Sequence, residues 1–169
     1  LGGVCLNWGC IPTKALIYNA NVVELLHNAA DFGVSFDNLK VDFGAAVKRS
    51  RDIVGRQTKG VAFLMKKNKI DVITGTGKIK KGGKVEVKGP DGAIKEYTAK
   101  HTILATGGRS RELPNLKQDG KKVIGYRQAM VLPQQPKSMV IVGSGAIGVE
   151  FAYFYNALGT KVTIVEYLD

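Results

Sequence analysis

Apolar residues recur every three or four positions in three stretches of this chain, which predicts three amphipathic helices. The first follows Pro12, the second covers residues 42–67 with Asp42 as its N-cap, and the third runs from about residue 148 to Leu158, where Gly159 can end it. The apolar face of the second helix consists of Phe43, Ala46, Val47, Val54, Val61, Leu64 and Met65.

Short apolar runs between the second and third helices predict strands. Residues 71–74 form one such run, and residues 101–105 are typical of a buried strand. Residues 84–88 alternate with a period of two and return at 93–99 after a Gly-Pro-Asp-Gly turn, which predicts a small antiparallel meander. The segment Gly75-Thr76-Gly77 permits close approach of the backbone to another strand or to a ligand.

The amino-acid composition limits the classes of protein to which this chain can belong. The 169 residues allow one domain or parts of two, and a hydrophobic content of 44% is enough for a core. The chain contains no run of eighteen apolar residues, so the sequence indicates no membrane span. The net charge of +11 raises nucleic-acid binding as a possibility. The lysines are scattered over turns without interleaved aromatic residues, however, so we expect no nucleic-acid partner.

Cys5 and Cys10 are the only cysteines of the chain and stand five positions apart. A disulfide needs Cα atoms about 4.4–6.8 Å apart, whereas five helical positions rise about 7.5 Å, so the pair can bridge only where the backbone folds back. Asn7 and Gly9 suit such a fold, and Pro12 suits the first position of the following helix. Cys10 would then lie just before a helix N-terminus, which favours a thiolate.

This placement indicates a redox-active dithiol, to which Lys14 adds positive charge one turn further on. A structural disulfide of a secreted domain is a weaker alternative, because such small domains usually carry more cysteines. A zinc site is weaker still, since two cysteines with His27 and His101 lack the paired spacing of zinc ligands. A chain that opens on Leu1 without a signal peptide fits a cytoplasmic protein, or a mitochondrial matrix protein in a eukaryote.

The end of the chain has the pattern of a dinucleotide-binding fold. Residues 138–142 predict a strand, the sequence GSGAIG follows at 143–148, the third helix comes next, and residues 161–165 predict a second strand closed by Glu166. A GxGxxG alone is a weak signal, but strand, glycine loop, helix, strand and acid in this order make a strong one.

Each position in that pattern has a physical purpose. Gly143 allows the tight turn, Gly145 lets the backbone approach a pyrophosphate, and Gly148 lets the helix pack on the strand. Glu166 can accept hydrogen bonds from both ribose hydroxyls and would repel a 2′-phosphate, which favours NAD(H) over NADP(H).

The segment from Gly2 to Leu16, GGVCLNWGCIPTKAL, closely resembles the active-site motif of the dihydrolipoamide dehydrogenases, flavoproteins of the pyridine nucleotide–disulfide oxidoreductase family. ATGGR at 105–109 resembles the family's Ala-Thr-Gly element against FAD, and residues 143–166 resemble its NAD motif. The resemblance covers essentially the whole chain. It implies an α/β fold made of portions of two Rossmann-like domains, FAD-binding and NAD-binding, with a small antiparallel β-meander.

The same resemblance implies three segments. Residues 1–110 would be the C-terminal part of the FAD-binding domain with the dithiol, 111–137 a crossover rich in proline, glutamine and lysine, and 138–169 the start of the NAD-binding domain.

The resemblance also implies a role for each site residue. Cys5 would exchange with the lipoyl sulfurs and Cys10 would lie against the flavin as a thiolate. Lys14 would lie near the reactive edge of FAD, paired with Glu150. FAD would further contact Gly77, Thr106 and Gly107, and NAD would contact Gly143, Gly145, Ile147, Gly148 and Glu166.

The implied reaction moves electrons from a dihydrolipoyl dithiol through the Cys5–Cys10 disulfide and FAD to NAD⁺. The implied partners are the lipoyl domain of a 2-oxoacid dehydrogenase or glycine cleavage complex, and a second copy in a homodimer. The family's first nucleotide-binding motif and its interface domain with a His–Glu pair have no counterpart in these 169 residues. We therefore expect a fragment that binds FAD poorly and turns over no substrate.

Three alternatives stay open. An NADPH-linked disulfide or mercuric reductase relative is disfavoured by Glu166, because basic residues are usual near that position. A non-catalytic basic binding module predicts a salt-sensitive complex with nucleic acid. A thiol–disulfide exchanger without flavin predicts thiols that cycle while NADH has no influence.

Overall fold

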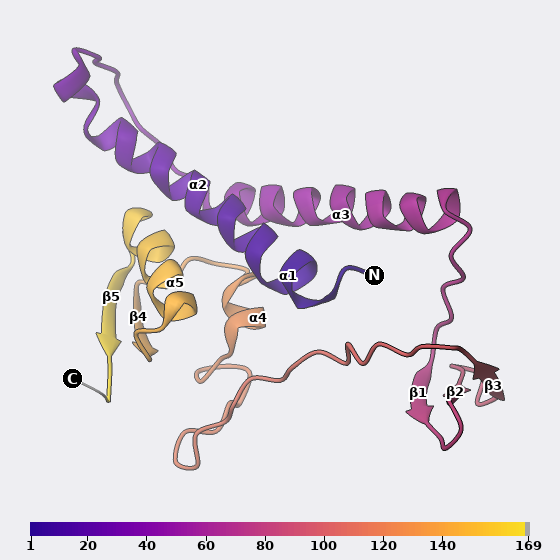
Figure 1. Cartoon of the computed structure of the whole chain (residues 1–169). Helices are drawn as coiled ribbons and strands as arrows, with labels where there is room; N and C mark the ends of the chain where they lie inside the picture. Colours follow the sequence, from indigo (N-terminus) through magenta and orange to yellow (C-terminus); the bar gives the residue numbers. More distant parts are fainter. Residues whose placement is uncertain (168–169) are drawn as a thin grey trace. The chain divides into compact units, whose positions relative to one another are not determined.

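The computed structural model describes residues 1–167, which fold into two compact units (Figure 1). Unit 1 combines residues 1–61 with the chain from Arg109 onward, and unit 2 comprises residues 62–108. Helices and strands mix in the way that the sequence predicts, so the α/β fold class is confirmed. The predicted domain boundaries stay predictions, because the compact units reflect contacts inside this chain alone.

The chain begins with two helices separated by a single residue. Helix α1 (Gly3–Trp8) ends at Gly9, and α2 (Cys10–His27) starts directly after it. The prediction that Cys10 precedes the helix is therefore wrong by one residue, and Pro12 occupies the third helical position rather than the first. Proline is tolerated there because the first four N–H groups of a helix have no partner within it.

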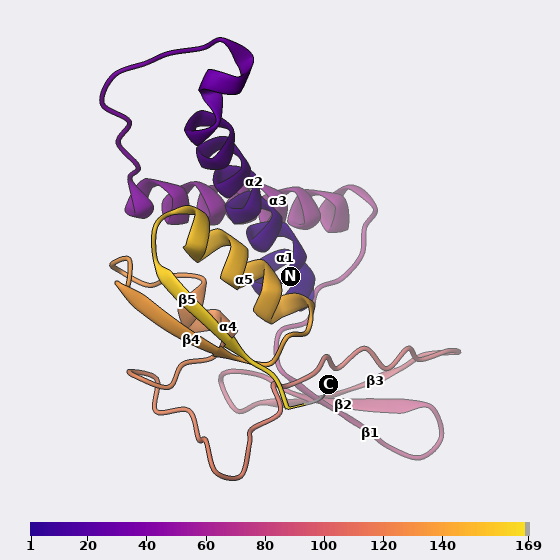
Figure 2. The same cartoon turned by 90° about the vertical axis from the view of Figure 1, so that its left-hand side faces the viewer.

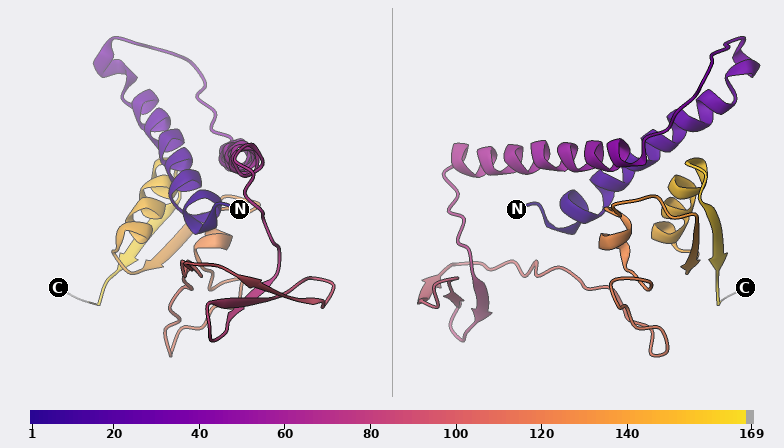
Figure 3. Two further views of the ribbon diagram at one scale, coloured as in Figure 1. Left: turned by 45° about the vertical axis from the view of Figure 1, so that its right-hand side comes forward. Right: turned by 180° about the vertical axis from the view of Figure 1, so that it is seen from behind.

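A 3₁₀ turn, η1 (Ala29–Phe32), leads to the long helix α3 (Phe43–Lys67), which is one unbroken helix in the right-hand view of Figure 3. The predicted cap is confirmed, because the Ala45 N–H donates to Asp42 Oδ1 at 2.9 Å. Only the N-terminal half of the predicted apolar face is buried, and Leu64 is exposed.

The core of unit 1 lies among four helices. Phe43 of α3 contacts Phe154 and Tyr155 of helix α5 (Ala146–Ala157), with ring centroids 6.0 and 5.9 Å apart. Tyr155 is fully buried and its hydroxyl donates to the carbonyl of Ala129. The remaining core residues are Leu16, Ala20 and Val23 of α2, Ala46 of α3, and Met130, Phe151, Ala157 and Leu158.

Strands β4 (Ser138–Val142) and β5 (Lys161–Val165) pair in parallel, with Val140 opposite Thr163, and α5 lies over them (Figure 2). A parallel pair needs a crossover, and α5 supplies it. These bounds agree with the predicted ones. The helix ends as expected at Gly159, which has a φ of +97°.

Unit 2 contains the predicted antiparallel meander, with one strand more than expected. Strands β1 (Thr76–Ile79), β2 (Lys84–Lys88) and β3 (Ile94–Thr98) pair in that order. The sequence analysis predicted β2 and β3 but placed no strand over β1. Gly77 lies in β1 opposite Val87, and a Cβ atom on Gly75 would lie 2.5 Å from the carbonyl oxygen of Lys88. The close approach in this segment is therefore to β2 and occurs at Gly75.

Two predicted strands, at 71–74 and 101–105, are not strands. Both segments lie outside regular structure, and the side chains of Ile103 and Leu104 are 91% and 69% exposed. A strand exists only beside a hydrogen-bonded neighbour, and among the described residues neither segment has one. The predicted burial of 101–105 is therefore wrong for this chain.

The crossover at 111–137 is more ordered than a linker. It contains the short helix α4 (Tyr126–Ala129), and Met130, which follows it, is 1% exposed. Asp119 accepts hydrogen bonds from three successive backbone N–H groups, which lower the pKa of its carboxyl. Within residues 1–167, no helix combines the length and the apolar character needed to cross a membrane.

Candidate active site

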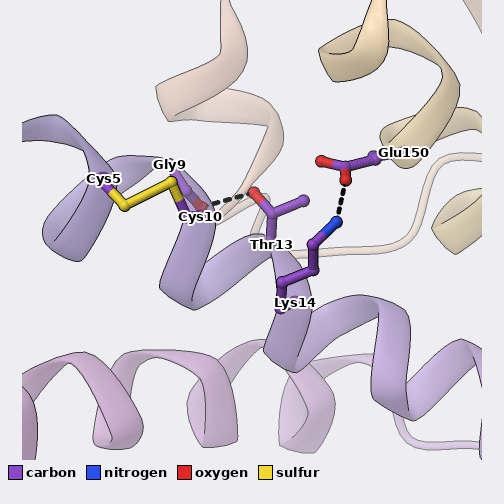
Figure 4. A network of polar contacts seen from close by, with 6 residues as sticks. All are labelled: Cys5, Gly9, Cys10, Thr13, Lys14 and Glu150. Atoms are coloured by element: carbon purple, nitrogen blue, oxygen red, sulfur yellow. Dashed lines mark hydrogen bonds and ion pairs between the residues drawn. A yellow bond between two sulfur atoms is a disulfide. The ribbon is translucent and has the colours of Figure 1, made fainter.

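Cys5 and Cys10 form a disulfide across the break between α1 and α2 (Figure 4). Their Cα atoms are 4.7 Å apart, which the fold-back at Gly9 makes possible. A Cβ atom at position 9 would lie 3.1 Å from both the Cα of Cys5 and the carbonyl oxygen of Val4. Gly9 therefore lets α1 approach α2, whereas Asn7, the other predicted fold-back position, is helical.

Both cysteine residues are exposed, and Cys10 occupies the first position of α2. Its sulfur is thus attached where the helix carries partial positive charge, which favours a thiolate once the disulfide is reduced. Thr13, which the sequence analysis did not single out, donates through Oγ1 to the Gly9 carbonyl at 2.7 Å. This bond to the residue four positions earlier stabilises the turn at which α2 starts. A threonine four positions after Gly9 is the sequence feature from which the bond could have been predicted.

Lys14 and Glu150 form an ion pair that joins α2 to α5 (Figure 4). The lysine side chain is 66% exposed and the glutamate side chain 29% exposed. The two residues lie 136 positions apart in the sequence, so only the packing of α2 against α5 brings them together. The predicted pair is present, and its predicted position near a flavin stays a prediction.

The glycine loop connects β4 to α5 in the way that its sequence predicts. Gly143 has a φ of +108°, and its N–H donates to the Val165 carbonyl at 2.8 Å. A Cβ atom on Gly148 would lie 2.2 Å from the carbonyl oxygen of Gly143. The third glycine thus permits the close approach of helix and loop. Gly145 is the extended N-cap residue, and Ile147 in the first turn of α5 is 62% exposed.

The carboxylate of Glu166 lies at this loop. Its Oε2 accepts hydrogen bonds from both the backbone N–H and the Oγ of Ser144, each at 2.6 Å. Sequence reasoning assigned no role to Ser144, although its place between two glycines of the motif was visible. The carboxylate therefore lies directly against the glycine loop, and its predicted contact with NAD stays a prediction.

The remaining predicted FAD contacts lie in unit 2, whereas the dithiol, Lys14 and the glycine loop lie in unit 1. Gly77 is part of the β1–β2 ladder. Thr106 and Gly107 belong to an exposed segment without regular structure, in which Gly107 has a φ of +77°. The FAD contacts of these three residues stay predictions.

Comparison with known proteins decides the family. Residues 1–169 match the family described as pyridine nucleotide-disulphide oxidoreductase over their whole length. The chain belongs to this family. The Cys5–Cys10 disulfide lies near the start of the matched residues, and the parallel β4–β5 pair lies near their end.

Curated relatives within the family are named dihydrolipoyl dehydrogenase. The chain is 51% identical over 166 residues to that of Chlorobaculum tepidum, covering 98% of this chain and 35% of the relative. It is 40% identical over 177 residues to that of Bacillus subtilis, covering 100% of this chain and 37% of the relative. The chain therefore spans little more than a third of the length of these relatives.

A solved structure has the same fold. The crystal structure of LpdA from Mycobacterium tuberculosis is similar to this chain with a TM-score of 0.89 at 26% sequence identity. The similarity covers 98% of this chain and 37% of the other.

Proposed function

We propose that this chain is part of an NAD-linked dihydrolipoyl dehydrogenase, in which electrons pass from a dihydrolipoyl dithiol through Cys5 and Cys10 and FAD to NAD⁺. One observation carries the proposal above the others. The Cys5–Cys10 disulfide bridges the break before α2, and Lys14, one turn further along α2, pairs with Glu150 of α5. The names of the relatives at 40–51% identity support the same substrate.

The exposed disulfide is suited to exchange with a substrate dithiol. A substrate thiolate attacks Sγ of Cys5, the Cys5–Cys10 bond breaks, and Cys10 leaves as a thiolate. The second substrate sulfur then attacks the first, which closes the substrate disulfide and releases the thiolate of Cys5. The enzyme pair has then gained the two electrons that the substrate lost.

Cys10 is the better leaving group of the two because it stands at the N-terminus of the long α2, whereas Cys5 lies within a short helix. When bound, FAD would supply two-electron chemistry, because it can accept an electron pair and pass it as hydride to a nicotinamide. Lys14, oriented by Glu150, would contact FAD. The resemblance assigns further FAD contacts to Gly77, Thr106 and Gly107.

The fold of the glycine loop fits NAD. Because Gly148 has no side chain, the carbonyl of Gly143 in the loop lies directly against it. The N-terminus of α5 therefore stays close to the turn where a pyrophosphate would bind. Glu166 would accept the ribose hydroxyls, and its negative charge would oppose a 2′-phosphate. Gly143, Gly145 and Ile147 would line the same site. The charge of Glu166 is also why we prefer NAD over the NADPH-linked alternative.

The test uses the longer natural protein that contains this chain. We expect it to reduce NAD⁺ with dihydrolipoamide, to prefer NAD⁺ to NADP⁺, and to lose this activity when Cys10 is replaced by serine. A Glu166→Ala variant should reduce the preference for NAD⁺ over NADP⁺ while leaving disulfide exchange at Cys5 intact. A protein that reduces glutathione disulfide with NADPH, but not NAD⁺ with dihydrolipoamide, would contradict the proposal.

The substrate dithiol belongs, in this proposal, to the lipoyl domain of a 2-oxoacid dehydrogenase or glycine cleavage complex, and the longer protein forms a homodimer. Free dihydrolipoamide and a lipoylated domain should therefore both serve as substrates, and sedimentation should give twice the subunit mass. A monomer that accepts only free dihydrolipoamide would contradict this part.

A further inference from the structure

The two cysteines stand on helices that are anchored very differently. Helix α1, which carries Cys5, contains no buried residue. Helix α2, which carries Cys10, contributes Leu16, Ala20 and Val23 to the core. The disulfide therefore joins a helix with three core residues to one that reaches the core through the half-buried Trp8.

Arg51 of α3 provides a further attachment of α1. Its Nη2 donates to the carbonyl of Asn7 at 2.6 Å, and its Cζ lies 4.5 Å from the centre of the Trp8 ring. Its Nη1 also contacts Sδ of the buried Met130 at 3.6 Å. Burial lowers the pKa of Arg51, as expected for a guanidinium held partly away from water. One side chain thus links the segment between the cysteines to the core.

Further contacts also attach the segment between the two cysteines to other elements. Arg127 lies with its Cζ 5.8 Å from the centre of the Trp8 ring, so two guanidinium groups contact this indole. Thr58 Oγ1 lies 3.5 Å from Asn7 Oδ1. The amide nitrogen of Asn7 donates back to the carbonyls of Leu1 and Gly3, and these two bonds stabilise the N-terminal segment internally.

We propose that Arg51 is a positioning residue of the redox disulfide, holding α1 against α3 so that Sγ of Cys5 stays within reach of Cys10 after reduction. This inference rests on the proposed function. The stability of a disulfide rises with the effective concentration of its two thiols, which depends on how tightly their elements are held together. Helix α1 also packs on α2, and Trp8 packs against the core, but without Arg51 the Asn7 carbonyl and the Trp8 ring lose their link to this side chain of α3. We expect the effective concentration to fall and the disulfide to become easier to reduce.

Arg49 is a matched control on the same helix. Its Nη1 donates to the Ala15 carbonyl at 3.1 Å and to Asn19 Oδ1 at 2.9 Å, and its Cζ lies 5.5 Å from the centre of the Tyr18 ring. Arg49 therefore makes the same kinds of contact as Arg51, but with α2, which the core holds in any case. Losing it removes an equal charge without releasing either cysteine.

The experiment equilibrates the longer natural protein with mixtures of reduced and oxidised dithiothreitol. Each reduced dithiothreitol breaks one Cys5–Cys10 bond, donates two electrons and two protons to the two sulfurs, and closes to its cyclic disulfide. Alkylation followed by peptide mass spectrometry gives the oxidised fraction. We expect Arg51→Gln to shift the equilibrium about tenfold toward the dithiol, or about 30 mV for a two-electron couple. Arg49→Gln should shift it less than about twofold.

Arg51→Lys separates charge from geometry, because lysine keeps the charge but cannot reproduce the planar fork that contacts Asn7 and Trp8 together. We expect it to behave like Arg51→Gln. Urea unfolding of each variant establishes that it folds, and Arg49→Gln shows what an equal loss of charge does.

An unchanged equilibrium in Arg51→Gln, an equal shift in Arg49→Gln, or wild-type behaviour of Arg51→Lys would each overturn the inference while leaving the proposed function standing. A wild-type disulfide that dithiothreitol cannot reduce and reform would overturn both.

Discussion

At Gly148 the packing leaves no space for even one carbon atom. The nearest obstacle to a Cβ is the backbone carbonyl of Gly143, which cannot rotate away as a flexible side chain could. Gly55 in the middle of α3 is different, because nothing lies within 4 Å of a Cβ placed there. Two glycines in two helices therefore have opposite requirements.

We predict that Gly148→Ala lowers the free energy of unfolding by about 1–3 kcal/mol, because the loop and α5 must move apart. Gly55→Ala should instead raise it by about 0.5–1 kcal/mol, since alanine restricts the unfolded chain and favours the helix. Urea unfolding followed by circular dichroism measures both. Equal effects of the two substitutions would show that the close approach at Gly148 does not exist in solution.

Tyr155 has a pH dependence whose sign follows from its burial. Burial raises the pKa of its phenol above the ordinary value of 10.0, so folding favours the neutral form. Its contribution is fully present below the unfolded pKa and is lost as the pH rises above it, at up to about 1.4 kcal/mol for each pH unit above about 10.

Tyr155→Phe should cost about 1 kcal/mol at pH 8, because the hydroxyl no longer donates to the Ala129 carbonyl. The difference in unfolding free energy between wild type and variant should shrink and close near pH 11. Comparing the two proteins cancels the titration of the lysines. A difference that stays constant from pH 8 to pH 11 would contradict the inferred burial of the phenol.

Helix α3 is stabilised at its N-terminal end and along its first half. Asp42 caps it, Phe43 and Ala46 pack into the core, and its second half exposes Phe63 and Leu64. The helix is long enough for propensity to contribute, but burial of one half provides the tertiary stabilisation.

We expect Asp42→Ala to lower the unfolding free energy by about 1 kcal/mol, because the Ala45 N–H loses its acceptor. Asp52→Ala in the same helix removes the exposed pair with Lys48 and should cost no more than about 0.5 kcal/mol. Thermal unfolding of both variants provides the comparison. The prediction fails should the two substitutions prove equally costly.

Residues 1–167 contain a helical core in unit 1 and, in unit 2, exposed apolar segments. Leu16 is 1% exposed in unit 1, whereas Ile103 in unit 2 is 91% exposed. Both are large aliphatic residues in strongly apolar stretches, so the sequence pattern ranks them alike.

In the 169-residue chain, Leu16→Ala should lower the unfolding free energy by about 2–5 kcal/mol through lost burial and the cavity left behind. Ile103→Ala should change it by less than about 0.5 kcal/mol, as for other exposed positions. Chemical denaturation of both variants decides the matter. A large loss on Ile103→Ala would mean that the segment at 101–105 is buried in solution after all.

The sequence by itself determined the elements whose signals are local. The cap at Asp42, the end of α5 at Gly159, the β2–β3 hairpin and the strand–glycine loop–helix–strand order at 138–166 all follow from residues within a turn or two of each other. Turn chemistry, capping and glycine backbone angles act over that range, which is why these predictions agree with the structure.

Tertiary structure alone decided what depends on distant partners. The segments at 71–74 and 101–105 have strand-like composition, but a strand also needs a neighbour that composition does not supply. The contact of Arg51 with Trp8 exists only because α3 packs beside α1, and the core role of Met130 only because the crossover folds back. Hydrogen-bond ladders and side-chain packing join residues far apart in the chain, so no local pattern records them.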